Sequence, residues 1–159
     1  MMPFLDRERD RMRVAPAGKA DIDDRIALRA ALWPGHGDHA GDIARMLAAP
    51  ERFITFLARD ESGAAIGFAE VSLRHDYVNG CETSPVGFLE GIYVVPAHRL
   101  RGVARALVGA AENWTRAQGA SEFASDALLD NTASHRMHAA LGFVETERVV
   151  AFRKVLGKR

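Results

Sequence analysis

Apolar and polar positions along the chain change several times between the period of a strand and the period of a helix. Strand-like patterns are expected over residues 13–16, 52–59, 64–75, 86–95, 122–127 and 147–155. Helical spacing is expected over residues 21–33, over a short segment that follows a turn at 37–41 and ends before Pro50, and over 102–118 and 131–141. The pattern therefore predicts one strand, two helices, a pair of strands, and then strand, helix, strand, helix and strand.

The connections between these segments predict how the strands pair. Residues 60–63 have a composition suited to a hairpin turn, so the strands on either side of them are expected to be antiparallel. Residues 86–95 are apolar on both faces apart from Glu90, which is typical of a central strand. The right-handed crossover rule makes the strands before and after the 102–118 helix parallel neighbours. The expected fold class is α/β (α+β mixed sheet), with antiparallel N-terminal strands and a parallel central strand pair flanked by helices.

Length and composition predict one folded domain. The chain has 159 residues, of which 48% are hydrophobic and 26% are charged, and this excludes disordered and collagen-like classes. Residues 1–11 carry mixed charges with little to bury, so we expect a flexible leader there and a single domain over 12–159. The pattern contains no internal repeat.

Charge and cysteine content narrow the function class. Twenty-one basic residues balance twenty-one acidic ones, which disfavours a nucleic-acid partner. Cys81 is the single cysteine, so the chain forms no internal disulfide and holds no site that needs two cysteine ligands, and this fits a reducing compartment. No secretory signal and no apolar run of about 18 residues is present. We therefore expect a cytoplasmic protein with no membrane partner.

The turn between the 86–95 strand and the 102–118 helix suits an anionic group. A helix N-terminus leaves backbone N–H groups unpaired and carries partial positive charge, which together favour a pyrophosphate. Gly102 and Ala104 keep the first turn small, and three arginines add positive potential, namely Arg99, Arg101 and Arg105. The alternative interpretation, an ordinary polar turn flanked by arginines, stays open.

Gly91 interrupts an otherwise bulky strand. A glycine inside a strand indicates a bulge, or a point where a ligand or another chain lies against the backbone. In the second case the peptide groups of Ile92, Tyr93 and Val94 are available to an amide-rich ligand arm that pairs like a strand. A glycine selected only by crowding is the alternative.

Several sequence blocks resemble a known family. The pattern Arg99-x-x-Gly102-x-Ala104 after Val94-Val95-Pro96 resembles the acetyl-CoA loop of the GNAT superfamily of N-acetyltransferases, whose element order agrees with nearly the whole chain. Six further blocks are similar to the aminoglycoside 6'-N-acetyltransferase branch of that superfamily, at residues 32–36, 74–81, 88–92, 124–126, 131–132 and 138–148. The resemblance covers the chain in the right order, which makes it far more specific than the loop alone.

This resemblance implies acetyl transfer from acetyl-CoA to the 6'-amine of aminoglycoside antibiotics, by a protein of a commonly homodimeric family that needs no metal. The residues that it implies for the cofactor are Ile92, Tyr93, Val94, Arg99, Leu100, Arg101, Gly102, Val103, Ala104 and Asn131. The residues that it implies for the aminoglycoside are Trp33, His36, Tyr77, Glu90, Asp126 and Glu147.

The chemistry of the residues agrees with a polycationic acceptor. All formal charge over residues 76–90 comes from Asp76, Glu82 and Glu90, and all formal charge over residues 120–134 comes from Glu122, Asp126 and Asp130. Two acidic stretches and a separate basic loop suit a cationic acceptor beside an anionic cofactor. Ordinary solvated faces are the alternative interpretation.

Glu90 and Asp126 are the candidate catalytic residues. Glu90 shares a strand face with Phe88 and Ile92, where a carboxylate is costly unless it is paired or used, and where desolvation makes it a better proton acceptor. Our hypothesis is that Glu90 takes the proton of the amine, with Asp126 as the rival base. The N–H near Val94 would polarise the thioester carbonyl.

Other candidates are weaker. Cys81 is not expected to be a nucleophile, and His36, Asp38, His39 and Asp42 are interpreted as a solvated loop rather than a metal site. His138 occupies the position where many GNAT enzymes carry a tyrosine general acid, so the acid is not assigned. Two alternative functions remain, a GNAT enzyme for another amine such as a polyamine or peptide N-terminus, and a non-catalytic acyl-CoA-binding module.

Overall fold

The structure is a computed structural model that describes residues 11–158. The flexible leader expected over residues 1–11 lies outside these residues, except for Arg11. The chain forms two compact units, one that ends at Asp126 and one that begins at Ala127. Each unit is described by itself below. Within the described residues, no helix combines the length and the apolar character that a membrane span requires.

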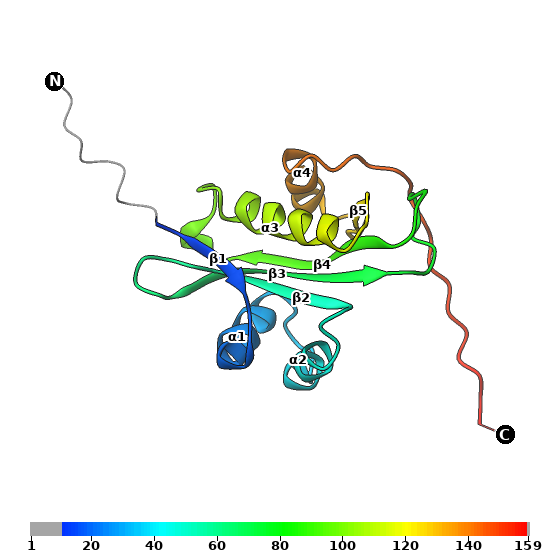
Figure 1. Ribbon diagram of the computed structural model, residues 1–159. Helices are drawn as coiled ribbons and strands as arrows, with labels where there is room; N and C mark the ends of the chain where they lie inside the picture. The colour runs from blue at the N-terminus through cyan, green and yellow to red at the C-terminus, as the bar shows by residue number, and fades with distance from the viewer. Residues whose placement is uncertain (1–10, 159) are drawn as a thin grey trace. The chain divides into compact units, whose positions relative to one another are not determined.

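The first unit contains one mixed sheet of five strands in the order β1-β2-β3-β4-β5 (Figure 1). The strands are β1 Arg13–Pro16, β2 Phe53–Arg59, β3 Ala65–Arg74, β4 Val86–Val94 and β5 Phe123–Ser125. The pairs from β1 to β4 are antiparallel, and β4 pairs with β5 in parallel. This topology confirms the predicted fold class, including the parallel pair on either side of the crossover helix.

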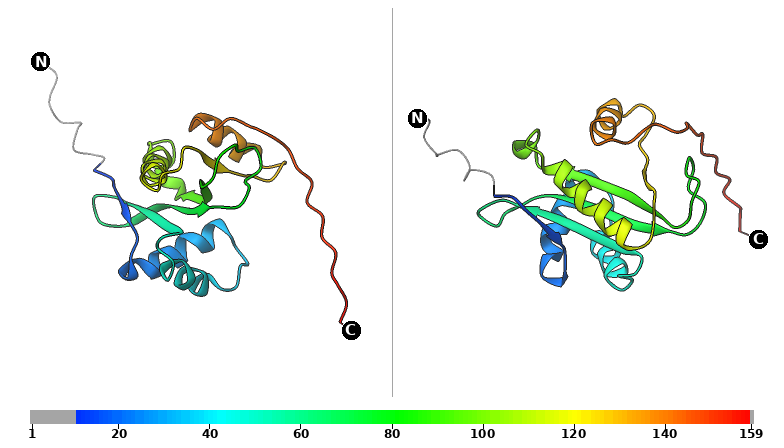
Figure 2. Two further views of the ribbon diagram at one scale, coloured as in Figure 1. Left: turned by 45° about the vertical axis from the view of Figure 1, so that its right-hand side comes forward. Right: turned by 45° about the horizontal axis from the view of Figure 1, so that its top comes forward.

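Helices cover both faces of this sheet. Figures 1 and 2 show α1 (Ile22–Leu32) and α2 (His39–Leu47) on one face and α3 (Val103–Ala117) on the other. Short 3-10 turns at Lys19–Asp21 and Pro96–His98 precede α1 and the basic loop. The buried residues of α3 recur at helical spacing from Val103 through Leu107 to Ala111, so this helix places one apolar stripe on the sheet.

Helix α2 begins earlier than the sequence pattern suggested. Residues 37–41 were expected to form a turn, yet the helix starts at His39. The carboxylate of Asp38 accepts a hydrogen bond of 3.0 Å from the backbone N–H of Gly41. This N-cap satisfies one of the N–H groups that a helix start leaves unpaired, so the glycine is accommodated in the first turn.

The second unit contains α4 (Thr132–Ala140). Its N-cap is Asn131, whose side-chain oxygen accepts a hydrogen bond of 3.1 Å from the N–H of Ser134. The strand expected over residues 147–155 is wrong for this structure, because no strand of the described chain pairs with that segment. Alternating apolar residues make a strand only where a neighbouring strand accepts their backbone hydrogen bonds. Phe152 in this segment is 92% exposed.

Candidate functional site

Strand β4 loses its neighbour halfway along its length. The parallel ladder with β5 joins Gly87, Phe88 and Leu89 to residues 123–125 and then ends. On the opposite side, the N–H of Val95 donates to the carbonyl of Ile66 over 2.9 Å. Because bonded and non-bonded positions alternate in an antiparallel ladder, the peptide groups of Ile92 and Val94 face the side that β5 has left. This geometry agrees with the expectation that a ligand arm can pair with β4.

A β-bulge lies at the point where the two strands part. Glu70 of β3 is opposite Gly91, and Val71 is opposite Leu89, so Glu90 is the extra residue of β4. A Cβ atom at Gly91 would lie 2.5 Å from the ring of Trp33, which follows α1. The expected bulge is therefore confirmed. Crowding by Trp33 is an equally direct reason for the glycine.

The basic loop joins this open edge to α3. Arg99 turns back onto β4 and donates from Nε to the carbonyl of Val94 over 2.8 Å. Leu100 and Gly102 both have a left-handed backbone, with φ of 62° and 82°. No side chain caps the N-terminus of α3, and open space surrounds the position of a Cβ at Gly102. A helix start without a side-chain cap is a type of site that suits an anion, and Gly102 is required by its backbone conformation.

Gly102→Ala is expected to lower the free energy of unfolding by about 1–2 kcal/mol, the cost of a left-handed backbone for a residue with a Cβ. The same change should weaken binding of coenzyme A, because the loop relaxes away from the conformation that presents its N–H groups. Chemical denaturation and calorimetric titration measure the two effects.

Gly109→Ala in the middle of α3 is the matched control. A Cβ at Gly109 meets open space and its backbone is helical, so alanine should raise stability by about 0.8–1 kcal/mol. Equal effects of the two substitutions would contradict the role given to Gly102.

Glu90 is paired. Its Oε1 accepts a hydrogen bond of 2.5 Å from Oγ of Ser72. Arg74 donates from Nη2 to Oε1 over 2.8 Å and to Oε2 over 3.0 Å. The guanidinium of Arg74 also lies over the ring of Phe88, with Cζ 3.5 Å from the ring centroid. These partners compensate the cost of placing a carboxylate at this position. Because the pairing alone accounts for Glu90, its role as a base stays a prediction.

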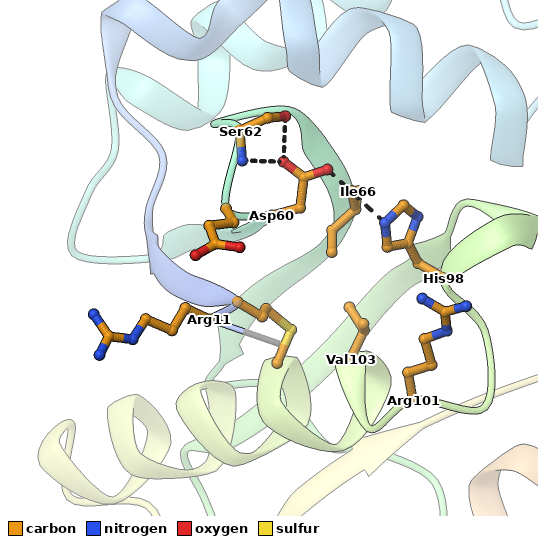
Figure 3. A pocket seen from close by; sticks show the side chains of 9 residues that line it. Arg11, Asp60, Ser62, Ile66, His98, Arg101 and Val103 are labelled. Carbon is orange, nitrogen blue, oxygen red and sulfur yellow. Dashed lines mark hydrogen bonds and ion pairs between the residues drawn. The ribbon is translucent and has the colours of Figure 1, made fainter. Parts of the chain in front are cut away.

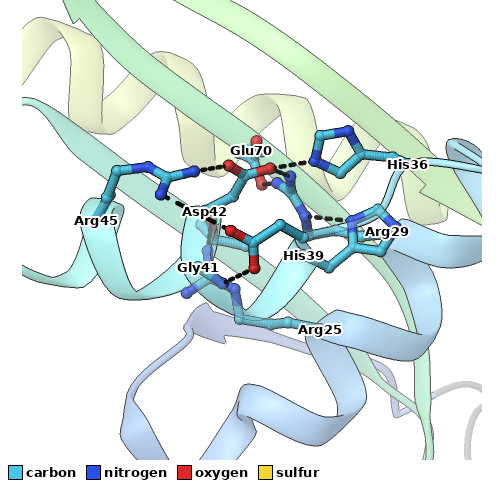
Figure 4. A network of polar contacts seen from close by, with 10 residues as sticks. Arg25, Arg29, His36, His39, Gly41, Asp42, Arg45 and Glu70 are labelled. Atoms are coloured by element: carbon cyan, nitrogen blue, oxygen red, sulfur yellow. Dashed lines mark hydrogen bonds and ion pairs between the residues drawn. The ribbon is translucent and has the colours of Figure 1, made fainter.

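A buried polar network lies between α1, α2 and β3 (Figure 4). Arg29 is its centre: the guanidinium contacts Glu70, donates to Asp42 over 2.9 Å and donates to Nδ1 of His39 over 3.2 Å. Its Cζ atom lies 4.9 Å from the centroid of the Trp33 ring. Arg29 therefore connects the sheet to the segment that carries Trp33.

Asp42 connects the same network to His36. Nε2 of His36 lies 2.6 Å from Oδ2 of Asp42, and Arg45 contacts the other carboxylate oxygen. Partial burial acts to raise the pKa of Asp42, but the hydrogen bonds from His36 and Arg45 and the charge of Arg29 lower it overall. Desolvation lowers the pKa of Arg25, which donates to Oγ1 of Thr55 over 2.8 Å.

The lowered pKa of Asp42 makes its contribution to stability dependent on pH. A carboxyl whose pKa is lower in the folded state stabilises the fold above its unfolded value, about 3.9, and loses this contribution as pH falls through the folded value. Asp42→Asn should therefore unfold at lower denaturant concentration at neutral pH and lose less stability on acidification below about pH 4. Urea unfolding at neutral and acid pH measures this, and parallel curves would contradict it.

The remaining candidates are distributed over both units. Asp126 directly follows β5, one residue beyond the Leu89–Ser125 pair at which the parallel ladder ends. Tyr77 lies in the loop after β3 and is 77% exposed. Asn131, His138 and Glu147 belong to the second unit, where Nδ1 of His138 lies 2.7 Å from the carbonyl oxygen of Ser134. The first unit thus brings Trp33 and Glu90 together at the bulge of β4, and Asp126 follows the end of the neighbouring strand β5.

Arg29, Glu70, Ser72 and Arg74 were not expected from the sequence. One signal for three of them exists: positions 70, 72 and 74 are polar at a spacing of two inside an otherwise apolar strand. That spacing places the three on one sheet face, where Glu70 contacts α1 and the other two contact Glu90. Arg29 has no comparable signal, because an arginine in a helix is usually solvated.

A separate cavity of about 530 Å³ lies beside the start of α3 (Figure 3). Asp60 and Ser62 of the β2–β3 turn line it together with His98, and Arg101 and Val103 are the two expected cofactor residues on its wall. Its lining mixes both signs of charge, so it does not by itself indicate a ligand class.

Cys81 lies outside this cavity. Burial and the neighbouring carboxylate of Glu122 raise the pKa of its thiol, which disfavours the thiolate form.

Comparison with known proteins agrees with this arrangement. The model of the acetyltransferase (GNAT) family matches residues 23–143. A protein of Serratia marcescens named aminoglycoside N(6')-acetyltransferase type 1 is 51% identical over 139 residues, which is 86% of this chain and 94% of the relative.

Solved structures give the same result. AAC(6')-Iy in complex with the bisubstrate analogue CoA-S-monomethyl-acetylneamine is 47% identical and has a TM-score of 0.87, with 91% of this chain and 99% of that chain covered. Aminoglycoside antibiotic 6'-N-acetyltransferase AAC(6')-Ih from Acinetobacter baumannii is 46% identical with a TM-score of 0.87, covering 92% and 99%.

Proposed function

Because the chain belongs to the acetyltransferase (GNAT) family, and within it to the aminoglycoside N(6')-acetyltransferases, we propose that it transfers the acetyl group of acetyl-CoA to the 6'-amine of aminoglycoside antibiotics. The observation that carries the proposal is the separation of β4 from β5. Within the described residues it leaves the edge of β4 between Glu90 and the basic loop before α3 without a strand neighbour, and Asp126 directly follows the end of β5. An anionic thioester and a cationic amine can meet at that edge.

The residues present fit coenzyme A. The N-terminus of α3 lacks a side-chain cap, and the loop of Arg99, Leu100, Arg101, Gly102, Val103 and Ala104 would surround a pyrophosphate there. Ile92, Tyr93 and Val94 would hold the amide-containing arm along β4. Asn131 is the proposed contact from the second unit, and its side-chain oxygen is already used in the cap of α4. Bound acetyl-CoA supplies the activated acyl group.

The chain's own groups then position and activate the amine. The N–H of Val94 would polarise the thioester carbonyl, because its peptide group faces the open edge. Glu90 or Asp126 would accept the proton that the attacking amine loses, directly or through water. Trp33, His36, Tyr77 and Glu147 would contact the rest of the aminoglycoside. His138 or water would return a proton to the departing thiolate of coenzyme A.

We further propose a homodimer in the cytoplasm. Support for the dimer comes from the second unit, where Val149, Val150, Phe152 and Val155 expose apolar side chains that a second copy could cover. The single cysteine, Cys81, cannot form a disulfide within the chain, which is compatible with a reducing compartment. Light scattering of the purified protein tests the dimer, and a monomer at micromolar concentration would contradict it.

The activity is tested by following release of coenzyme A with acetyl-CoA and a panel of amines. Aminoglycosides with a 6'-amine should be acetylated at that nitrogen, as identified by NMR of the product, and analogues with a 6'-hydroxyl should not. Turnover with a polyamine or a peptide N-terminus alone would favour another acceptor. Binding of acetyl-CoA without turnover of any amine would indicate a non-catalytic module.

A further inference from the structure

The carboxylate proposed to meet the acceptor amine already holds a cation of this chain. Arg74, the last residue of β3, reaches Glu90 with three hydrogen bonds, of which the shortest is 2.8 Å. Ser72 from the same strand donates to the same carboxylate. Glu90 therefore presents a neutral ion pair to the acceptor side.

The position of Arg74 allows its guanidinium to leave. The side chain of Arg74 is 41% exposed and that of Glu90 is 29% exposed, so water reaches both partners. Within the described residues, Glu90 is the carboxylate that Arg74 contacts, and the ring of Phe88 is the surface on which it rests. An exchange of this cation for another one would require no change in the sheet.

The guanidinium also resembles the group that would replace it. It is a cation on a flexible stem that donates to both oxygens of Glu90 and covers the face of an aromatic ring. A protonated amine of an aminoglycoside offers the same charge and N–H donors, although not in a fork. An amine without a second positive charge elsewhere would have less to gain from displacing Arg74.

We propose that Arg74 is a specificity-determining residue that acts as a resident counter-ion of Glu90 and is displaced when a polycationic acceptor binds. This inference rests on the proposed function, because it requires that Glu90 receive the acceptor. By occupying Glu90 in the free enzyme, Arg74 keeps the site uncharged toward monovalent cations and neutral amines. A polycation prevails because its other positive charges add to its attraction for the acidic residues of the chain.

The test replaces Arg74 by glutamine and measures steady-state kinetics at two salt concentrations. Without its competitor, a 6'-amino aminoglycoside should have a KM about 1.5- to 5-fold lower, the range expected for a partly exposed ion pair. The KM should also rise more steeply with added salt, because Glu90 then presents a full charge. A monoamine acceptor should gain relative to the aminoglycoside. Arg74→Lys keeps the charge but loses the forked geometry, so its KM should lie between that of the unaltered enzyme and that of Arg74→Gln.

Arg52→Gln is the matched control. Arg52 also lies over an aromatic ring, that of Phe53 at 5.4 Å, and it has no carboxylate partner within the described residues. The Arg52→Gln substitution should leave the acceptor KM and the salt dependence of that KM unchanged. The melting temperatures of Arg74→Gln, Arg74→Lys and Arg52→Gln distinguish the proposed role of Arg74 from a purely structural one. In a purely structural role, Arg74→Gln would lower the melting temperature and raise KM.

The outcomes distinguish the two proposals. Acetylation by the unaltered enzyme together with an unchanged or raised KM in Arg74→Gln would overturn the role of Arg74 and leave the proposed function intact. Absence of acetyl transfer to any aminoglycoside by the unaltered enzyme would overturn the proposed function itself. NMR spectra of the Arg74 Nε–H group should show a change in its chemical shift when tobramycin binds. An unchanged chemical shift would contradict displacement of Arg74.

Discussion

Replacement of Glu90 by glutamine is expected to lower kcat for a 6'-amino aminoglycoside by about 100-fold, the lower part of the range for loss of a general base. Glutamine keeps the size of the side chain, and its amide oxygen can still accept hydrogen bonds from Ser72 and Arg74. The fold and the bulge should therefore persist while the proton acceptor is lost. Steady-state kinetics across pH, with the melting temperature measured in parallel, provide the comparison.

Asp126→Asn separates the two candidate bases. Asp126 directly follows β5 and is exposed, so we expect it to anchor an ammonium group. Its loss should raise KM for the acceptor with a smaller effect on kcat, the behaviour of a group that binds ground state and transition state alike. If Glu90→Gln kept full turnover across pH and Asp126→Asn lost it, the roles would be reversed.

The sheet and its crossover helix could be predicted from the sequence because they depend on patterns within single segments. The apolar stripe from Val103 to Ala111 specified one face of α3, and the two-sided apolar run around Glu90 specified a central strand. The bulge was also predictable, since Gly91 is out of place in such a strand. The open edge beyond Leu89 follows from these features together with the shortness of β5.

The partners of the site residues could not be predicted in the same way. Whether Glu90 is alone or paired depends on Arg74, 16 residues away, and on the register between β3 and β4, which the bulge alters. Arg29 is paired with Glu70, 41 residues away. Long-range ion pairs of this kind leave no periodic signal in the sequence.

The segment 147–155 shows a case in which a local pattern predicted an element that the structure does not form. Its alternating residues follow the strand pattern, but a pattern records which side chains would share a face and not whether a neighbouring strand is present. In the second unit as described, no strand pairs with these residues, and Val149 and Phe152 are exposed. A local pattern therefore predicted an element whose formation requires a partner.

Arg29→Ala is expected to lower the free energy of unfolding by about 3–5 kcal/mol, the cost of removing one partner from a buried ion pair. The guanidinium is almost fully buried, and its loss leaves the carboxylate of Glu70 buried without that partner. Such a loss is a large part of the roughly 5–15 kcal/mol that stabilises a domain. Trp33 would lose the cation beside its ring, so KM for the acceptor should rise in any folded fraction. Urea unfolding and acceptor kinetics measure the two effects.

Arg45→Ala is the matched control, because Arg45 contacts the same Asp42 from a side chain that is 67% exposed. An exposed pair of this kind contributes about 0–1 kcal/mol, so the two arginines should differ by several-fold in their effect on stability. The double substitution Arg29→Met with Glu70→Met removes both buried charges and should recover much of the lost stability. It should not recover the acceptor KM, because the link from the sheet to Asp42 and Trp33 is still missing. Equal stability of Arg29→Ala and Arg45→Ala would contradict the central place of Arg29 in the network. Recovery of both stability and KM in the double variant would show that the network contributes only to packing and does not position the acceptor site.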